Sequence, residues 1–168
     1  MANKASFTPD EWTKVMESVA VTGMAVTAAD PSGLWGMLKE ALAGGAALAQ
    51  AKADPHANEL VKAVIADFES VDSRHAVQEA LKQRFADAKP GDVVPRALEI
   101  LRQASAVLDA KAPADAPAFK AWLNSVAAKV AEASKEGGFL GFGGVQVSEA
   151  EKATLAEIAA ALGTSAQA

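Results

Sequence analysis

Few side chains in this sequence are of types that carry out chemistry at neutral pH. The histidines are His56 and His75, and neither stands in a His-Glu-x-x-His or Glu-x-x-His pattern that would hold a metal ion. No serine lies in a Gly-x-Ser-x-Gly motif, and the chain has no cysteine, which excludes thiolate catalysis and cysteine-based zinc sites. We therefore expect no enzyme activity, no cofactor and no metal site.

The two histidines have plain structural interpretations. His56 follows Asp54 and Pro55, a pair that is typical of a capped helix start, so its ring is expected to be solvated in the first turn. His75 follows an Asp-Ser-Arg run, where an ion pair or a place on a helix face is expected. An enzyme would require a pocket that joins one of them to carboxylates.

The most distinctive stretch runs from Gly137 to Ser148 and interrupts what otherwise reads as one helix after another. Its glycines open backbone conformations that are closed to other residues, and its phenylalanines and leucine are costly to leave in water. Within it we predict a candidate interaction loop, made of Gly138, Phe139, Leu140, Gly141, Phe142 and Gly143.

Four roles are open to this loop. Packing of its apolar side chains onto the protein's own core is favoured, followed by contact with a partner protein or small ligand and by contact with a membrane surface. Phosphate binding is the least favoured, because Val145 and Gln146 follow the glycines where a phosphate-binding loop has lysine. The flanking acidic residues are expected mainly as caps and on solvated faces: Glu132, Glu136, Glu149, Glu151 and Glu157.

A second candidate corner repeats the pattern of glycine, two large apolar residues and glycine. It consists of Gly33, Leu34, Trp35 and Gly36, and it matches Gly138 to Gly141. The match suggests the hypothesis of two corners related by a pseudo-twofold axis, which would make the pair the site to test first.

Composition predicts an all-α protein. Of the 168 residues 51% are hydrophobic but only 5% are aromatic, so alanine supplies much of the apolar content and favours helices. We expect one domain over 1–168, a bundle of roughly seven helices with a Gly/Phe-rich loop before the last helix and frayed ends at 1–6 and 164–168. Start and stop signals predict a first helix from 9 to 28 or 29, a second after Pro31 and a third after Pro55. The third ends at a break at 71–73, and a fourth helix runs from there to about 88, before a turn at 89–92. The last three helices are predicted at 93–111, from 115, and from 149 to a C-cap at 163.

Charge and hydropathy restrict the partners. The net charge is -5 and there is no basic stripe, so nucleic acid is not expected as a partner. The start of the chain lacks the apolar core of a signal peptide, and the longest apolar run, from Val19 to Ala29, is shorter than the ~20 residues that span a bilayer. We expect a cytoplasmic protein.

Three segments together resemble an uncharacterised family of small all-helical bacterial proteins. They are Phe7 to Trp12, Ala28 to Gly36, and Gly137 to Gly144 with the following Val147 to Glu151. More distantly, the loop that leads into Ser-Glu-x-Glu and an apolar helix is similar to the tellurite-resistance TerB-like helical domain. Members of that family have an Ala-Asp-Gly acidic loop, where this chain has Ala29-Asp30-Pro31, so the resemblance implies no metal ligand here.

The resulting functional expectation is a non-enzymatic cytoplasmic protein that acts through protein–protein or small-ligand binding, with self-association included. The alternative is a peripheral membrane-associated protein that uses the loop around Phe139 and Phe142.

Overall fold

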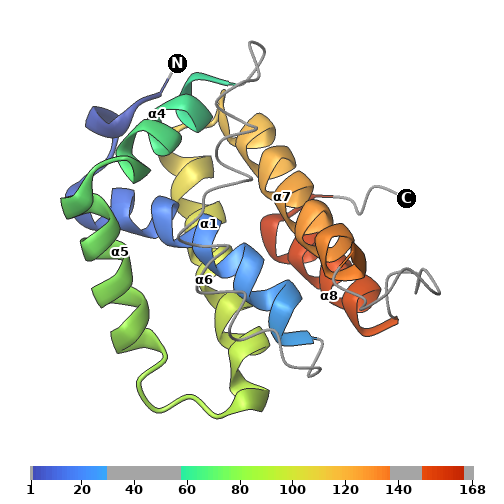
Figure 1. Ribbon diagram of the computed structural model, residues 1–168. Coiled ribbons are helices and arrows are strands. Elements are labelled where there is room, and N and C mark those ends of the chain that lie inside the picture. Colours follow the sequence, from blue (N-terminus) through green and yellow to red (C-terminus); the bar gives the residue numbers. More distant parts are fainter. Residues whose placement is uncertain (1, 30–57, 137–148, 165–168) are drawn as a thin grey trace.

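The computed structural model describes residues 2–29, 58–136 and 149–164, with side chains up to residue 132 in the middle segment. These residues form six α-helices and two short 3₁₀ helices, which confirms the all-α class (Figure 1). The helix expected after Pro31 and the Gly/Phe-rich loop lie outside the described residues. The elements are η1 (Lys4–Ser6), α1 (Pro9–Ala29), α4 (Glu59–Phe68), α5 (Val71–Arg84), η2 (Pro90–Asp92), α6 (Val93–Lys111), α7 (Ala116–Glu136) and α8 (Glu149–Leu162).

Helix α1 is the central element of the bundle. Every residue from Val15 to Gly23 is buried, and at 3.6 residues per turn such a run covers all sides of a helix. Helices α4, α5, α6, α7 and α8 all pack against it. The middle of α1 is therefore covered by other helices on all sides.

Buried hydroxyls within α1 are satisfied by the helix itself. Ser18 Oγ donates to the carbonyl of Val15 at 2.6 Å, and Thr22 Oγ1 donates to the carbonyl of Ser18 at 2.7 Å. Such bonds to a preceding turn remove the cost of burying a hydroxyl. Polar residues can thus occupy the centre of the bundle without a partner on another helix.

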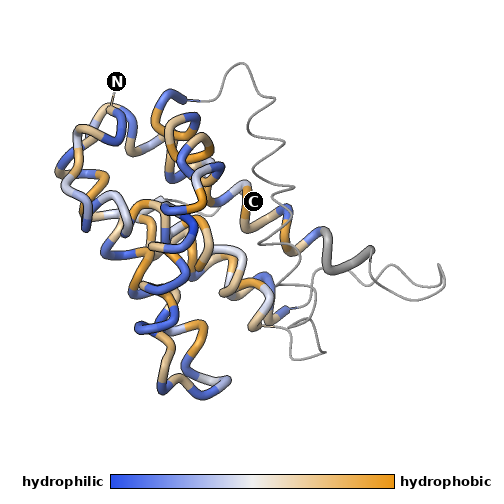
Figure 2. The backbone as a smooth tube through the Cα atoms, turned by 60° about the vertical axis from the view of Figure 1, so that its left-hand side comes forward, coloured by the Kyte–Doolittle hydropathy of each residue, from blue (hydrophilic) through white to orange (hydrophobic). Residues whose placement is uncertain are grey.

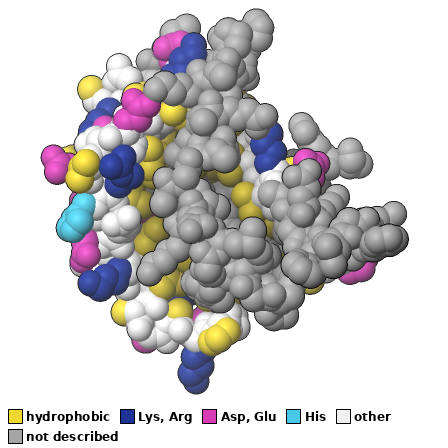
Figure 3. All heavy atoms as spheres, in the orientation of Figure 1, with side chains coloured by type: hydrophobic (Ala, Val, Ile, Leu, Met, Phe, Trp, Pro, Cys, Tyr) yellow, Lys and Arg dark blue, Asp and Glu magenta, His cyan; other side chains and the backbone are white. Residues whose placement is uncertain are grey.

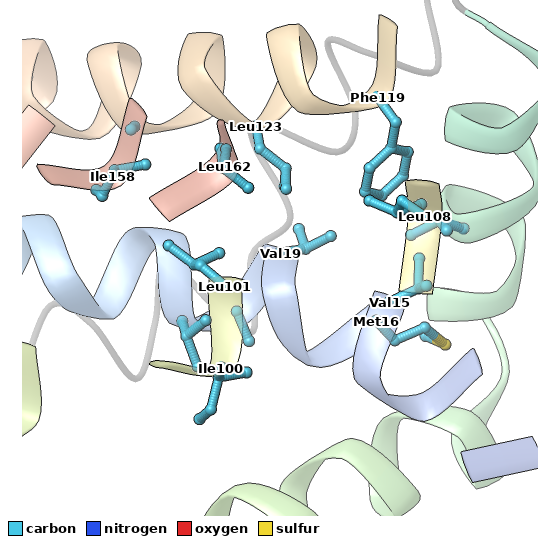
Figure 4. Packing of buried hydrophobic residues seen from close by; sticks show 14 of the residues in the cluster. Val15, Met16, Val19, Ile100, Leu101, Leu108, Phe119, Leu123, Ile158 and Leu162 are labelled. Carbon is cyan, nitrogen blue, oxygen red and sulfur yellow. The ribbon is translucent and has the colours of Figure 1, made fainter. Parts of the chain in front are cut away.

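The core is built where α1, α6, α7 and α8 meet (Figure 4). Figure 2 shows hydrophobic and hydrophilic residues alternating along the helices, as expected when each surrounding helix turns one face inward. The large apolar side chains of α6 and α7 are buried or partly buried. Side chains labelled in Figure 4 include Val15, Met16, Val19, Leu101, Leu108, Phe119, Leu123, Ile158 and Leu162.

The start of the first predicted helix and the end of the last one have the expected caps. Thr8 donates its N–H to Glu11 Oε2 at 2.8 Å, and Glu11 donates its N–H to Thr8 Oγ1 at 3.3 Å, which completes the capping box. The rings of Phe7 and Trp12 lie 5.5 Å apart, as in a hydrophobic staple. Gly163 ends α8 with a φ of 69°, the left-handed conformation of a C-cap.

The boundary between α4 and α5 differs from the prediction. Helix α4 ends at Phe68, and α5 begins at Val71 with Ser70 as its N-cap, so the predicted break at 71–73 falls inside the first turn of α5. The Ser73 N–H faces Ser70 Oγ at 3.5 Å, which shows that the cap precedes the position we expected. Helix α5 also ends at Arg84, earlier than the predicted residue 88.

Residues 2–6, expected to fray, are held by the bundle. Ala2 donates its N–H to Asp115 Oδ2 at 2.6 Å, and Lys4 Nζ pairs with Asp67 at 3.0 Å. Asn3 caps η1 through a bond from the Ala5 N–H. This segment is therefore tied both to α4 and to the residue that precedes α7.

Candidate functional site

Helices α1 and α7 run in the same direction. Near their starts, Glu11 pairs with Lys111 at 3.2 Å, and Lys111 is the last residue of α6, just before α7. Further along, a Cβ placed on Gly23 of α1 would stand 4.0 Å from Cγ2 of Val130 in α7. The C-terminal ends of both helices, Ala29 and Glu136, therefore lie at the same end of the bundle.

Helix α8 runs in the opposite direction to α7. Asn124 in α7 donates its Nδ2–H to Thr164 Oγ1, just beyond the end of α8, at 2.7 Å. The start of α8 at Glu149 consequently lies beside the end of α7, on the lower right in Figure 1. We call the region where α1 and α7 end and α8 begins the loop-bearing end.

Both sequence-predicted candidates follow, in the sequence, helices that end here. The corner from Gly33 to Gly36 begins four residues after Ala29, and the loop from Gly138 to Gly143 begins two residues after Glu136. Every residue of both candidates lies outside the described residues, so their internal geometry and their pseudo-twofold relation stay predictions. The described helices nevertheless place Ala29 and Glu136, the residues that precede the two candidate segments, at the same end of the bundle.

The described side chains give the loop-bearing end an apolar interior and a charged exterior, where Lys129 and Lys152 are exposed beside the acidic residues. Val26 and Ala131 are buried, whereas Glu132 is exposed and the side chain of Glu149 is 90% exposed. Glu149 also accepts a bond from Lys152 Nζ at 2.7 Å. Glu151 is an exception to the predicted solvated faces, because it is only 4% exposed in the first turn of α8.

A second polar cluster, which the sequence reasoning missed, ties α5 and α6 to α1. Glu17 is 1% exposed and accepts a bond from Arg84 Nε at 3.0 Å, and Arg84 Nη1 donates to Gln103 Oε1 at 3.3 Å. Glu17 Oε2 is buried and has no hydrogen-bond partner among the described residues. The available signal was that Glu17 is the only acidic residue of α1 beyond its first turn. A buried carboxylate paired with a guanidinium in this way links helices, because removal of either partner would leave the other charge uncompensated.

A third polar cluster centres on Asp67 at the end of α4. Its carboxylate accepts bonds from Trp12 Nε1 at 2.7 Å, from Ser73 Oγ at 2.9 Å and from Lys4 Nζ at 3.0 Å. Burial raises the pKa of Asp67, but the bonds from Trp12, Lys4 and Ser73 outweigh it and hold the pKa below 3.8. The cluster joins η1, α1, α4 and α5, so it also has a structural role.

The described part of the chain contains neither a metal-binding cluster nor a helix that could span a membrane. Within it, no three or more His, Asp or Glu residues gather closely enough to hold a metal ion. His75 is exposed on α5, on the side where Figure 3 shows charged side chains of both signs, and His56 lies outside the described residues. Over residues 2–29, 58–136 and 149–164, no helix combines the length and hydropathy needed to cross a bilayer.

The fold and these clusters can be set beside known proteins. Comparison of the chain with protein-family models, with curated proteins and with solved structures finds no match in any of the three.

Proposed function

We propose that this protein is a non-enzymatic binding protein whose contact surface is the loop-bearing end, where the loop Gly138–Gly143 and the corner Gly33–Gly36 engage a partner protein or a second copy of the chain. The observation that carries the proposal is the shared direction of α1 and α7, which brings the points of departure of both segments to one end. Two segments that are far apart in the sequence then act as one surface.

The residue types of the two segments suit protein recognition. Phe139, Phe142 and Trp35 are large aromatic side chains, the type that most often supplies the dominant contacts of an interface. The neighbouring glycines let such side chains approach a partner without steric hindrance from their own backbone. An apolar pocket on the partner is the matching surface.

The described surroundings add an expectation about charge. The exposed charges at the loop-bearing end are of both signs, Glu132 and Glu149 beside Lys129 and Lys152, so the apolar side chains rather than net charge select the partner. The buried residues of α1, α7 and α8 pack these helices together, which gives such a contact a rigid support.

The proposal is tested with the full chain and three proteins: wild type, Phe139→Ser/Phe142→Ser, and Val71→Ser. Val71 is 69% exposed on α5, so its replacement removes exposed apolar surface away from the loop-bearing end. Sedimentation velocity over a wide concentration range measures self-association, and photo-crosslinking from position 140 in living cells captures other proteins. We expect complexes with wild type and Val71→Ser but not with the double variant. Absence of wild-type complexes, or complexes unchanged in the double variant, would overturn the proposal.

The membrane alternative is decided by the same proteins. Co-sedimentation with vesicles of mixed anionic and neutral phospholipid measures lipid binding. Vesicle binding by wild type that is lost with Phe139→Ser/Phe142→Ser would replace the protein partner by a membrane surface. The loop contains no lysine or arginine to attract anionic lipid, and this is why a protein partner is preferred.

A further inference from the structure

Helix α5 has the smallest buried share of the described α-helices. Of its 14 residues only Val77 is buried, whereas α6 buries eight of its 19 residues. Leu81, and Phe85 just beyond the end of α5, are partly buried against the core. The helix lies at the edge of the bundle, on the left in Figure 1 and across α1 from α8. Little apolar surface therefore holds α5 to the rest of the protein.

Polar side chains attach α5 at its two ends. At its start, Ser73 Oγ donates to Asp67 Oδ2 of α4 at 2.9 Å. At its end, Arg84 Nε donates to Glu17 Oε1 of α1 at 3.0 Å, and the Arg84 carbonyl accepts a bond from Arg96 Nη1 of α6 at 2.8 Å. We call the contacts of Arg84 with α1 and α6 the clasp.

The ion pair of the clasp is costly to bury. Glu17 is 1% exposed, and a buried carboxylate loses hydration that only complete pairing repays. Its Oε1 receives Arg84, but its Oε2 is buried and receives no hydrogen bond from any described residue. An acceptor in that state costs free energy, which is regained when α5 moves away and water reaches the carboxylate. Hydration of Glu17 therefore favours the opening of α5.

We propose that α5 opens from the bundle as a unit, by local unfolding of residues 70–88, while α1, α6, α7 and α8 stay folded. A helix of 14 residues is marginal in water without tertiary contacts, so α5 melts when its contacts break. The open form uncovers the carboxylate of Glu17 and the apolar side chains of Val77 and Leu81. Helix α5 is thus a conformational switch that the clasp keeps closed. This inference does not depend on the proposed binding function of the loop-bearing end.

The first measurement relies on the absence of cysteine from this chain, so that one introduced thiol reports on opening. Val77→Cys places the thiol on α5, and Val15→Cys places it on α1. Val77 and Val15 are 4% and 0% exposed, so a disulfide reagent reaches either thiol only after the structure opens. We expect labelling of Val77→Cys to be about a hundredfold faster or more. Equal rates would overturn the proposal.

The second measurement separates opening of α5 from unfolding of the whole bundle. Ile158 is buried on α8, and Ile158→Ala weakens the core. It should speed labelling of Val15→Cys by about tenfold or more but leave Val77→Cys within about twofold, because the contacts of Ile158 persist when only α5 is open. An equal acceleration at both positions would show that α5 opens only with the whole bundle, against the proposal.

The third measurement tests the clasp in the Val77→Cys chain. Arg84→Met leaves Glu17 buried without its cation and should speed labelling about a hundredfold. Glu17→Met/Arg84→Met removes both charges and should reverse most of that increase. The matched control is Lys82→Met, because Lys82 is 76% exposed and pairs with Glu79 within α5, and it should leave the rate unchanged. The clasp does not hold α5 if Arg84→Met and Lys82→Met have the same rate.

A fourth measurement needs no substitution. Hydrogen exchange of the backbone amides, followed by mass spectrometry, should be about a hundredfold faster over 71–84 than over the buried middle of α1 at 15–23. Urea below the unfolding transition should accelerate exchange in α5 less than in α1, since a local opening exposes less surface. The same protection and the same urea dependence in both helices would refute the opening of α5 as a unit.

Discussion

Replacing Asp67 by asparagine tests whether one carboxylate organises the N-terminal half of the bundle. Its side chain is 17% exposed and joins Trp12, Ser73 and Lys4, which lie on three other elements. Asparagine keeps the shape of aspartate but removes the charge and turns one acceptor into a donor. The amide oxygen can face Trp12 and Ser73, and the ion pair with Lys4 is then lost.

The magnitude follows from the exposure of each partner. A hydrogen bond to a charged group contributes about 1 kcal/mol more than a neutral one, which applies to Trp12, itself 3% exposed. The ion pair adds at most about 1 kcal/mol, because the Lys4 side chain is 59% exposed. Asp67→Asn should therefore cost about 1–2 kcal/mol. Asp67→Ala leaves the buried indole N–H of Trp12 without its acceptor and should cost about 3 kcal/mol.

The assay is urea unfolding followed by far-UV circular dichroism, because the fluorescence of Trp12 is itself altered by the change. A loss of 1–2 kcal/mol should lower the melting temperature by about 4 °C in a domain of this size. The pH dependence provides an independent readout. The pKa of Asp67 is lower in the folded chain than its ordinary 3.8, so its contribution is fully present above pH 3.8 and is lost as the pH falls through the folded pKa. The gap between wild type and Asp67→Asn should narrow on acidification.

The matched control is Asp87→Asn, which removes a carboxylate that is 83% exposed and pairs with Arg96. Its unfolding midpoint should stay close to that of wild type. Asp67 does not have this role if Asp67→Asn is as stable as the control, if Asp67→Ala costs no more stability than Asp67→Asn, or if the stability gap between wild type and Asp67→Asn does not change at acidic pH.

Three further substitutions have outcomes set by the local structure. Gly23→Ala should raise stability by about 1 kcal/mol in urea unfolding, because the new Cβ would meet nothing closer than ordinary contact with Val130 at 4.0 Å; a loss would show that the helix must shift. Gly163→Ala should instead lower stability by about 1 kcal/mol, because alanine is strained at a φ of 69°, and an unchanged melting temperature would contradict this. Arg84→Met should cost about 3 kcal/mol by leaving Glu17 buried without its cation, and a Glu17→Met/Arg84→Met double variant should recover part of that loss.

Helix boundaries were predictable where short-range chemistry determines them. The capping box of Thr8 and Glu11 marks the start of α1, and the Ala112-Pro113 pair marks the end of α6 at Lys111. The break before α5 was placed too late, because Ser70 and Ser73 both have side chains that cap helices and local sequence does not choose between them. Packing of Asp67 against Ser73 is a tertiary contact that favours the earlier cap.

The candidate site was predictable only in part. The glycine and phenylalanine pattern identified two segments, and the described helices place their departure points at one end through contacts such as Gly23 with Val130. The buried acidic residues were missed, since Glu17 and Glu151 belong to types that are usually exposed. Their burial depends on which helices cover them, and this is not a property of the nearby sequence.

The sequence by itself therefore determined that the chain is helical and where several of its helices begin and end, because caps, prolines and apolar spacing act within a few residues. Only the tertiary structure decided that α1 is the central helix, that Asp115 meets Ala2 and that Asp67 gathers Lys4 and Trp12. These outcomes depend on residues separated by up to 113 positions, and only the packing of whole helices brings such residues into contact.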